Sequence, residues 1–186
     1  MAQLLMKFRA PRPGAHRPLP EGYTLSTCQT DEDALGWIAA CAEGLSTDAW
    51  TLAQFRQNML EPQGLAPEQI FLVKDPQGRV AATATGWIKG EDCGYLHMVA
   101  ALPEYRGLGL GAVVCQAVLD FFAGRGIARI LLNSDDWRLA ALKTYLNLGF
   151  LPVLNDFDMA DRWQAIYEKL GVRYPVYRVR LEEAAL

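Results

Sequence analysis

Apolar and polar residues alternate in several short segments of the first half of the chain. Residues 23–28 read YTLSTC, residues 70–88 hold two apolar runs around the sequence DPQG, and residues 94–102 read GYLHMVAAL. Alternation with a period of two is typical of strands that bury one face. The DPQG sequence is typical of a tight turn, so residues 70–88 are predicted to form a β-hairpin.

Helical periodicity follows or separates these strands. Residues 31–44 are predicted to form a helix capped by Thr30 or Asp31, and residues 47–60 a second helix that stops before Pro62. From Leu110 to Gly124 the apolar positions recur at intervals of three and four, which is typical of a helix lying on a sheet.

The second half of the chain continues as strand, helix, strand, helix and strand. Residues 128–133 (ARILLN) form an almost wholly apolar run, as expected of a strand buried on both faces. A helix capped by Asp135 or Asp136 is expected to end at Gly149, followed by a strand at 150–154, a helix at 159–171 and a terminal strand at 174–182. The predicted fold class is therefore α/β, with a mixed, mostly antiparallel central sheet flanked by helices.

The N-terminal segment has a different character. Residues 10–20 read APRPGAHRPLP, and four prolines in eleven residues deny the backbone its hydrogen-bond donors. Residues 1–21 are accordingly expected to be a Pro-rich arm, and residues 22–186 a single folded domain.

Composition and charge narrow the functional classes. The 186 residues are 51% hydrophobic and 21% charged, with a net charge of −3, which argues against a nucleic-acid-binding protein. No apolar run reaches the roughly 18 residues of a membrane span, and the opening MAQLLMKFR does not have the pattern of a secretory signal. The four cysteines form no CxxC pair, which favours buried, reduced thiols and a cytoplasmic location; they are Cys28, Cys41, Cys93 and Cys115. With two histidines in the chain, a metal site is not expected.

The sequence RGLGLG at residues 106–111 lies between a predicted strand and a predicted helix. Glycines at positions 107, 109 and 111 allow left-handed backbone and close approach of a ligand to the main chain. Amides at the start of a helix attract anions, and the Arg106 side chain suits phosphate oxygens. One glycine would suffice for a plain turn, so the loop is interpreted as a phosphate cradle.

This part of the chain resembles the GNAT superfamily of N-acetyltransferases. Residues 106–111 match its signature of Arg or Gln, two residues, Gly, one residue, and Gly or Ala, and AALKTYLNLGF at 140–150 resembles its second landmark. The resemblance implies a GNAT-like fold in which acetyl-CoA, as co-substrate, binds in a cleft where strand 95–101 splays from strand 129–133. It also implies that backbone groups of Val99, Ala100 and Ala101 pair with the pantetheine arm. The pyrophosphate would lie on Arg106, Gly107, Leu108, Gly109, Leu110 and Gly111.

The resemblance further implies direct transfer of acetyl from the thioester to an amine, with a main-chain amide near Val99 stabilising the oxyanion. Tyr145 lies where the family often has a general acid for the departing thiolate, and the Leu-Gly-Phe that follows favours this role over the alternative of a packing residue. His97 is a candidate base on the same strand, and alternation would place it on the same side as Tyr95 and Val99. A satisfied sheet histidine is the simpler alternative.

Other interpretations of the glycine loop stay open at this point. An NAD(P)-binding oxidoreductase would use the same glycines with Asp135 on a ribose, although Ala112 stands where the third glycine of G-x-G-x-x-G is expected. A catalytically silent CoA-binding module would keep the loop without turnover. The expected partner is a small-molecule or peptide amine, with neither nucleic acid nor membrane, and a homodimer is one assembly that the sequence leaves open.

Overall fold

The computed structural model describes residues 3–9, 17–43, 45, 48–62 and 64–172. The chain divides into two compact units. One spans His16–Ala128, and the other combines Met1–Ala15 with Arg129–Leu186. Each unit has its own set of paired antiparallel strands.

The unit His16–Ala128 is built on the strand order β2-β3-β4-β5. Its strands are β2 (Thr24–Thr27), β3 (Ile70–Lys74), β4 (Val80–Lys89) and β5 (Cys93–Ala101). Its helices are α1 (Asp31–Ala42), α2 (Leu52–Phe55), which continues as the π-helix η1 (Arg56–Leu60), the short 3₁₀ helices η2 (Pro67–Gln69) and η3 (Pro103–Tyr105), and α3 (Leu110–Ala123). The strands and hairpin expected between residues 23 and 102 are confirmed.

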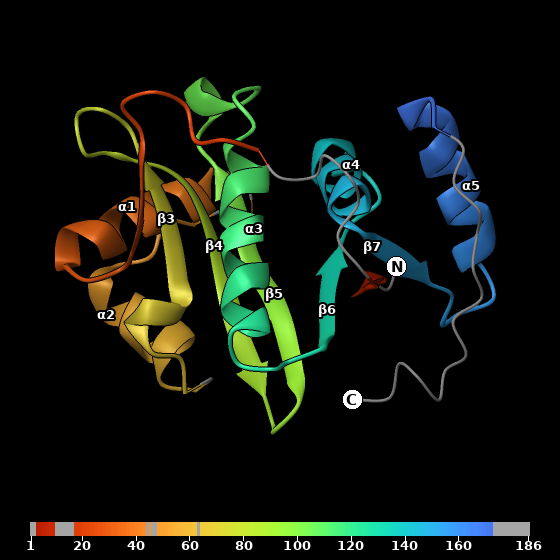
Figure 1. Ribbon diagram of the computed structural model, residues 1–186, viewed down its shortest axis with the longest axis horizontal. Coiled ribbons are helices and arrows are strands. Elements are labelled where there is room, and N and C mark those ends of the chain that lie inside the picture. The colour runs from red at the N-terminus through yellow and green to blue at the C-terminus, as the bar shows by residue number, and fades with distance from the viewer. Residues whose placement is uncertain (1–2, 10–16, 44, 46–47, 63, 173–186) are drawn as a thin grey trace. The chain divides into compact units, whose positions relative to one another are not determined.

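Helix α3 packs directly on β4 and β5, and Figure 1 shows it lying in front of these strands. Two glycines make the close approach possible. A β-carbon on Gly94 would lie 2.9 Å from ring atoms of Phe122, and one on Gly86 would lie 3.2 Å from Val118 and Phe121. Any larger side chain at Gly94 would therefore push the helix off the sheet.

Helix α1 supplies several side chains of the hydrophobic core cluster of this unit. Thr30 caps the helix in a capping box with Asp33, which confirms one of the two expected caps. Trp37 is buried at the centre of the cluster, against Trp50 and Phe55. The predicted second helix starts later than expected, at Leu52 with Thr51 as its cap.

The second unit has the strand order β6-β1-β7. It contains β1 (Leu4–Phe8), β6 (Arg129–Ser134), α4 (Leu139–Leu148), β7 (Phe150–Val153) and α5 (Met159–Leu170). Gly149 ends α4 with a φ of 109°, as expected of a left-handed helix stop.

Strand β1 corrects the expected domain boundary. Residues Leu4–Phe8 were assigned to a Pro-rich arm, but they form the central strand of this unit and pair with both β6 and β7. Leu4 and Met6 are fully buried, and the backbone of the strand is paired on both edges. Residues 10–16 of the predicted arm lie outside the described residues.

The expected cap of α4 is also wrong. The helix begins at Leu139, and the cap position is Arg138, which makes no side-chain capping hydrogen bond. Asp136 instead receives two hydrogen bonds from the guanidinium of Arg162 on α5, at 2.9 and 2.5 Å. Asp135 accepts a hydrogen bond from Gln3 at 3.2 Å. The predicted terminal strand at 174–182 lies outside the described residues.

Candidate active site

The glycine loop joins the end of β5 to the start of α3 through η3. Gly107 and Gly109 have φ values of 86° and 79°, and Gly109 is the N-cap of α3. An L-residue rarely adopts this left-handed backbone, so these two positions require glycine for conformation. Gly111 has no positive φ, and a β-carbon there would meet nothing within 4 Å. Its backbone is therefore open to approach from outside.

The amides of this loop point to an anion site. Among the described residues, none of the five amides from residue 107 to residue 111 has a hydrogen-bond partner, whereas the Ala112 and Val113 amides both donate to the Gly109 carbonyl. Unpaired amides at the N-terminus of a fourteen-residue helix carry partial positive charge. Unpaired amides at a helix N-terminus are the kind of backbone that binds phosphate.

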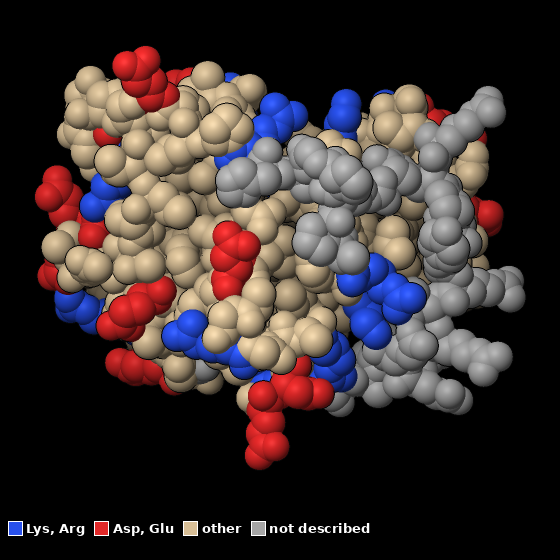
Figure 2. Space-filling model, viewed as in Figure 1, with Lys and Arg blue, Asp and Glu red and all other residues tan. Residues whose placement is uncertain are grey.

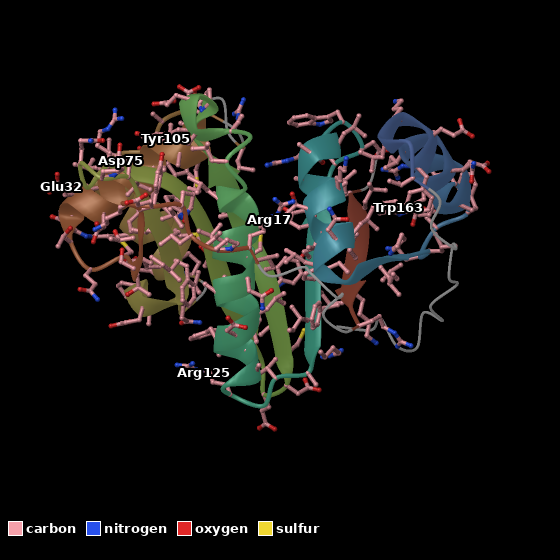
Figure 3. The ribbon with its side chains drawn as sticks, turned by 45° about the horizontal axis from the view of Figure 1, so that its top comes forward. Arg17, Glu32, Asp75, Tyr105, Arg125 and Trp163 are labelled. Atoms are coloured by element: carbon pink, nitrogen blue, oxygen red, sulfur yellow. The ribbon has the colours of Figure 1, made fainter. Side chains whose placement is uncertain are left out.

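Two arginines lie at the cradle. Arg106 is exposed and opens the loop, as the sequence indicates. Arg17, which no sequence motif marks, has its Cδ atom 3.5 Å from the position of a β-carbon on Gly109. Its guanidinium begins at the next atom, and the side chain is exposed. Figure 3 shows Arg17 beside α3 and Arg125 at the C-terminal end of the same helix.

The end of β5 carries a β-bulge. Thr83 pairs with Ala100 and Thr85 with His97, so Met98 and Val99 together face Ala84 alone. Met98 has a φ of 49° and is the one non-glycine residue with positive φ in the described part of the chain. Strained backbone of this kind is concentrated at functional sites, and bulges re-aim the strand beside them.

The bulge also overturns the expected alternation along β5. Met98 and Ala100 pack in the cluster around Trp37, together with Trp87, whose ring contacts His97. Val99 is not among the residues of this cluster. The inserted residue interrupts the alternation between His97 and Ala100, so alternation no longer supports the expectation that Val99 lies on the same side as His97.

His97 lies among aromatic side chains on the face of the sheet that carries the cluster around Trp37. Its ring centre is 5.8 Å from that of Trp87 and 6.2 Å from that of Tyr95, and the Lys89 ammonium lies 4.1 and 4.2 Å from those two rings. Burial, and then the Lys89 charge, lowers the pKa of His97 to about 4. The imidazole is therefore neutral at pH 7 and able to accept a proton.

Tyr145 lies on α4, in the other unit, where it is 5% exposed and packs edge-on against Phe150 at 6.1 Å. The packing role that the sequence allowed is therefore present. The ring accounts for this packing, so the proposed role as an acid depends on the Tyr145 hydroxyl alone.

A shallow crevice with room for about one water molecule, partly open to solvent, lies between α1 and the bulge of β5. Its lining is mainly apolar and consists of Trp37, Ile38, Cys41, Ala42, Asp48, Trp50 and Met98. The indole Nε1 of Trp37 is buried and has no hydrogen-bond partner among the described residues.

Other chemistry is sparse in the described residues. The four cysteines are buried and free, as the sequence predicts. Within the described ranges, no three His, Cys, Asp or Glu side chains come together as a metal site. None of the helices described has the length and apolar character to cross a membrane.

Over α3 and β3–β5, the face seen in Figure 2 is mainly uncharged, with acidic and basic side chains scattered singly.

The dinucleotide-binding alternative does not fit this site. A Rossmann domain would place its glycine loop after the first strand of a parallel βαβ unit. Here the loop follows β5, and β2 to β5 are paired antiparallel. Asp135, the candidate ribose ligand, is held by Gln3.

Comparison with known proteins places the chain in a family. The sequence model of the Acetyltransferase (GNAT) family matches residues 32–150. A mycothiol acetyltransferase of Thermomonospora curvata is 30% identical over 159 residues, covering 81% of this chain and 53% of that protein. One of Thermobispora bispora is 32% identical over 165 residues, covering 80% and 54%. The chain thus spans about half the length of the curated relatives that it matches.

Solved structures agree on the fold. A GCN5-related N-acetyltransferase from Sphaerobacter thermophilus aligns with a TM-score of 0.65 at 20% identity, covering 81% of this chain and 48% of that one. The ribosomal-protein-S18-alanine N-acetyltransferase from Escherichia coli aligns with a TM-score of 0.55 at 23% identity, covering 68% and 76%. The predicted fold class, with mostly antiparallel strands flanked by helices, is confirmed. The chain belongs to the acetyltransferase (GNAT) family.

Proposed function

We propose that this protein transfers an acetyl group from acetyl-CoA to an amine of a small-molecule or peptide acceptor by direct attack. The observation that carries the proposal is the run of five unpaired amides at residues 107–111, at the start of α3, in a chain of the GNAT family. Such a backbone suits the pyrophosphate of coenzyme A.

The cofactor is bound mainly by backbone in this proposal. The amides of Gly107, Leu108, Gly109, Leu110 and Gly111 hold the pyrophosphate, and Arg106 and Arg17 add positive charge beside it. Backbone groups of Val99, Ala100 and Ala101 pair with the pantetheine arm. No metal takes part.

The reaction forms one bond and breaks one. The amine nitrogen attacks the thioester carbonyl carbon, the carbonyl oxygen becomes an oxyanion, and collapse of this intermediate breaks the carbon–sulfur bond. The Val99 amide, at the bulge, stabilises the oxyanion. The Tyr145 hydroxyl gives its proton to the departing thiolate.

His97 takes the proton that leaves the amine. Transfer from a free ammonium with a pKa of about 10.4 to an imidazole with a pKa of about 4 is unfavourable by roughly 9 kcal/mol. The acceptor therefore loses its first proton to solvent water before attack, and His97 takes the second proton, which leaves the nitrogen after it has bonded to the carbonyl carbon. Once nitrogen has bonded to the carbonyl carbon, its pKa is well below that of the free ammonium. Transfer of its proton to the neutral imidazole of His97 is therefore less unfavourable at that later step.

The proposal is tested first by binding. Acetyl-CoA at a hundredfold excess over its Kd should stabilise the folded protein by about 2.7 kcal/mol and raise its Tm, because the ligand binds only the folded state. NADH should give no shift. A shift with NADH and none with acetyl-CoA would reject the acetyltransferase function.

Turnover separates an enzyme from a silent CoA-binding module. A panel of amine acceptors is incubated with acetyl-CoA, and CoA release is followed by thiol detection. Acceptor-dependent release supports the enzyme. Binding of acetyl-CoA without release for any acceptor in a broad panel would favour the silent module.

A further inference from the structure

Asp75 lies in the turn between β3 and β4 and is 3% exposed. Its Oδ1 accepts hydrogen bonds from the amides of Gln77 and Arg79, both at 2.9 Å. Its Oδ2 accepts from Arg79 Nε at 3.0 Å and from the hydroxyl of Tyr105 at 2.5 Å. The first two bonds are those of an ordinary turn, but the bond from Tyr105 comes from a distant part of the chain.

Tyr105 is the last residue of η3 and comes directly before the glycine loop. Its amide donates to the Leu102 carbonyl, and the Arg106 amide donates to the Pro103 carbonyl. The Tyr105 hydroxyl also receives a hydrogen bond from Arg79, whose guanidinium lies over the ring at 5.6 Å. The ring packs edge-on against Tyr23 at 6.4 Å. Figure 3 shows the Asp75 and Tyr105 side chains together.

Resting on the function proposed above, we infer that Asp75 and Tyr105 act as positioning residues for coenzyme A, by fixing the start of the glycine loop to the β3–β4 turn. Neither side chain contacts the cofactor. The hydrogen bond between them fixes the position of Tyr105 at the end of η3, and therefore the position of the loop amides from residue 107 onward.

The chemistry of the pair suits a rigid anchor. The hydrogen bond from Tyr105 lowers the pKa of Asp75 to about 2, and the same bond, with burial, raises the pKa of Tyr105 to about 12. At neutral pH the pair is a carboxylate and an intact hydroxyl, and such charge-assisted bonds are short and strong. Since a glycine-rich loop has little rigidity of its own, its precision must come from its neighbours.

Tyr105→Phe tests this inference, because it keeps the ring against Tyr23 and removes only the hydroxyl. In the full chain, we expect the Kd for acetyl-CoA, measured by calorimetry, to rise about tenfold, which corresponds to about 1.4 kcal/mol. With an acceptor, KM for acetyl-CoA should rise while kcat at saturating acetyl-CoA stays near that of the wild type. Asp75→Asn should shift Kd in the same direction.

Asp33→Asn is the matched control. Asp33 is 4% exposed and pairs with Lys74 at 2.5 Å, near the same end of β3, but contacts no part of the loop. It should lower Tm and leave the Kd for acetyl-CoA unchanged. A wild-type Kd in folded Tyr105→Phe, or an equal loss in Asp33→Asn, would overturn the inference. Neither result touches the proposed function, which is tested by acetyl-CoA binding and acceptor-dependent CoA release in the wild type.

Discussion

The Cδ atom of Arg17 lies 3.5 Å from the position that a β-carbon on Gly109 would take, so a residue far upstream of the loop reaches its centre. The guanidinium attached to that carbon is exposed and within reach of any anion bound to the loop amides. This places a second arginine at the proposed pyrophosphate site.

Arg17→Gln should therefore weaken acetyl-CoA binding by about tenfold, roughly the contribution of one hydrogen bond to a charged group. Arg125→Gln removes the same charge from the other end of α3, where Arg125 lies on the Phe121 ring at 3.8 Å, and should leave Kd unchanged. Calorimetry at two salt concentrations checks this, because the Arg17 effect should shrink as salt screens it. Equal effects of both variants would show that only net charge matters.

The loop glycines have two separable roles. Gly109→Val should abolish acetyl-CoA binding, because a β-branched residue is strained at a φ of 79°. Gly111→Ala meets no atom within 4 Å and keeps an allowed backbone, so it should fold at least as well as the wild type. If phosphate approaches Gly111 closely, this variant also binds acetyl-CoA more weakly. Thermal shift with and without acetyl-CoA measures both properties.

Tyr145→Phe separates packing from catalysis at one atom. The ring remains against Phe150, so Tm should change little. If the hydroxyl protonates the thiolate, kcat should fall by roughly ten- to a thousandfold while the Kd for acetyl-CoA changes much less. Full activity in the folded variant would leave solvent as the proton source.

The pH dependence of kcat/KM reports on His97. Because its pKa is about 4, we expect no inflection near the usual histidine value of about 6.5, and a loss of activity only as the pH falls toward 4. Lys89→Met removes one of the two causes of this low pKa, so it should move the acid limb toward neutral pH. An unchanged profile in Lys89→Met and in His97→Gln would exclude His97 as the proton acceptor.

Acid stability reports on Asp75. Its pKa is lower in the folded protein than the usual value of 3.8, so its contribution is complete above about pH 4 and is lost as the pH falls through about 2. Asp75→Asn should therefore flatten the fall of Tm between pH 4 and pH 2. A parallel fall in both proteins would show that other carboxylates dominate.

Much of the fold follows from local pattern. The alternation on either side of DPQG predicts β3 and β4, and the glycine loop predicts the start of α3 at Leu110. Strand β1 was missed because five apolar-rich residues beside a Pro-rich segment give no local sign of the partners that bury them. The cap at Asp136 was wrong because its tertiary partner, Arg162, is 26 residues away.

The residues of the candidate site also fall into those that a local sequence pattern predicts and those that it does not. Residues 106–111 were found because glycine spacing is visible in one short stretch of sequence. Arg17 and Asp75 were not, since each acts through a contact with a residue many positions away, and Asp75 has a sufficient local explanation as a turn residue. The bulge at Met98 was not predicted, because left-handed backbone is expected at glycine, asparagine or aspartate and not at methionine.

The left-handed Met98 has a practical consequence for the engineering of this protein. A non-glycine residue held in this conformation costs about 1–3 kcal/mol, so a selection for heat resistance would test Met98→Gly, which relieves this strain but loses the packing of the side chain in the cluster around Trp37. The same change would remove the side chain that lines the crevice and loosen the backbone next to Val99. A thermostable variant found by such a selection should therefore be assayed for activity before its stability is counted as an improvement.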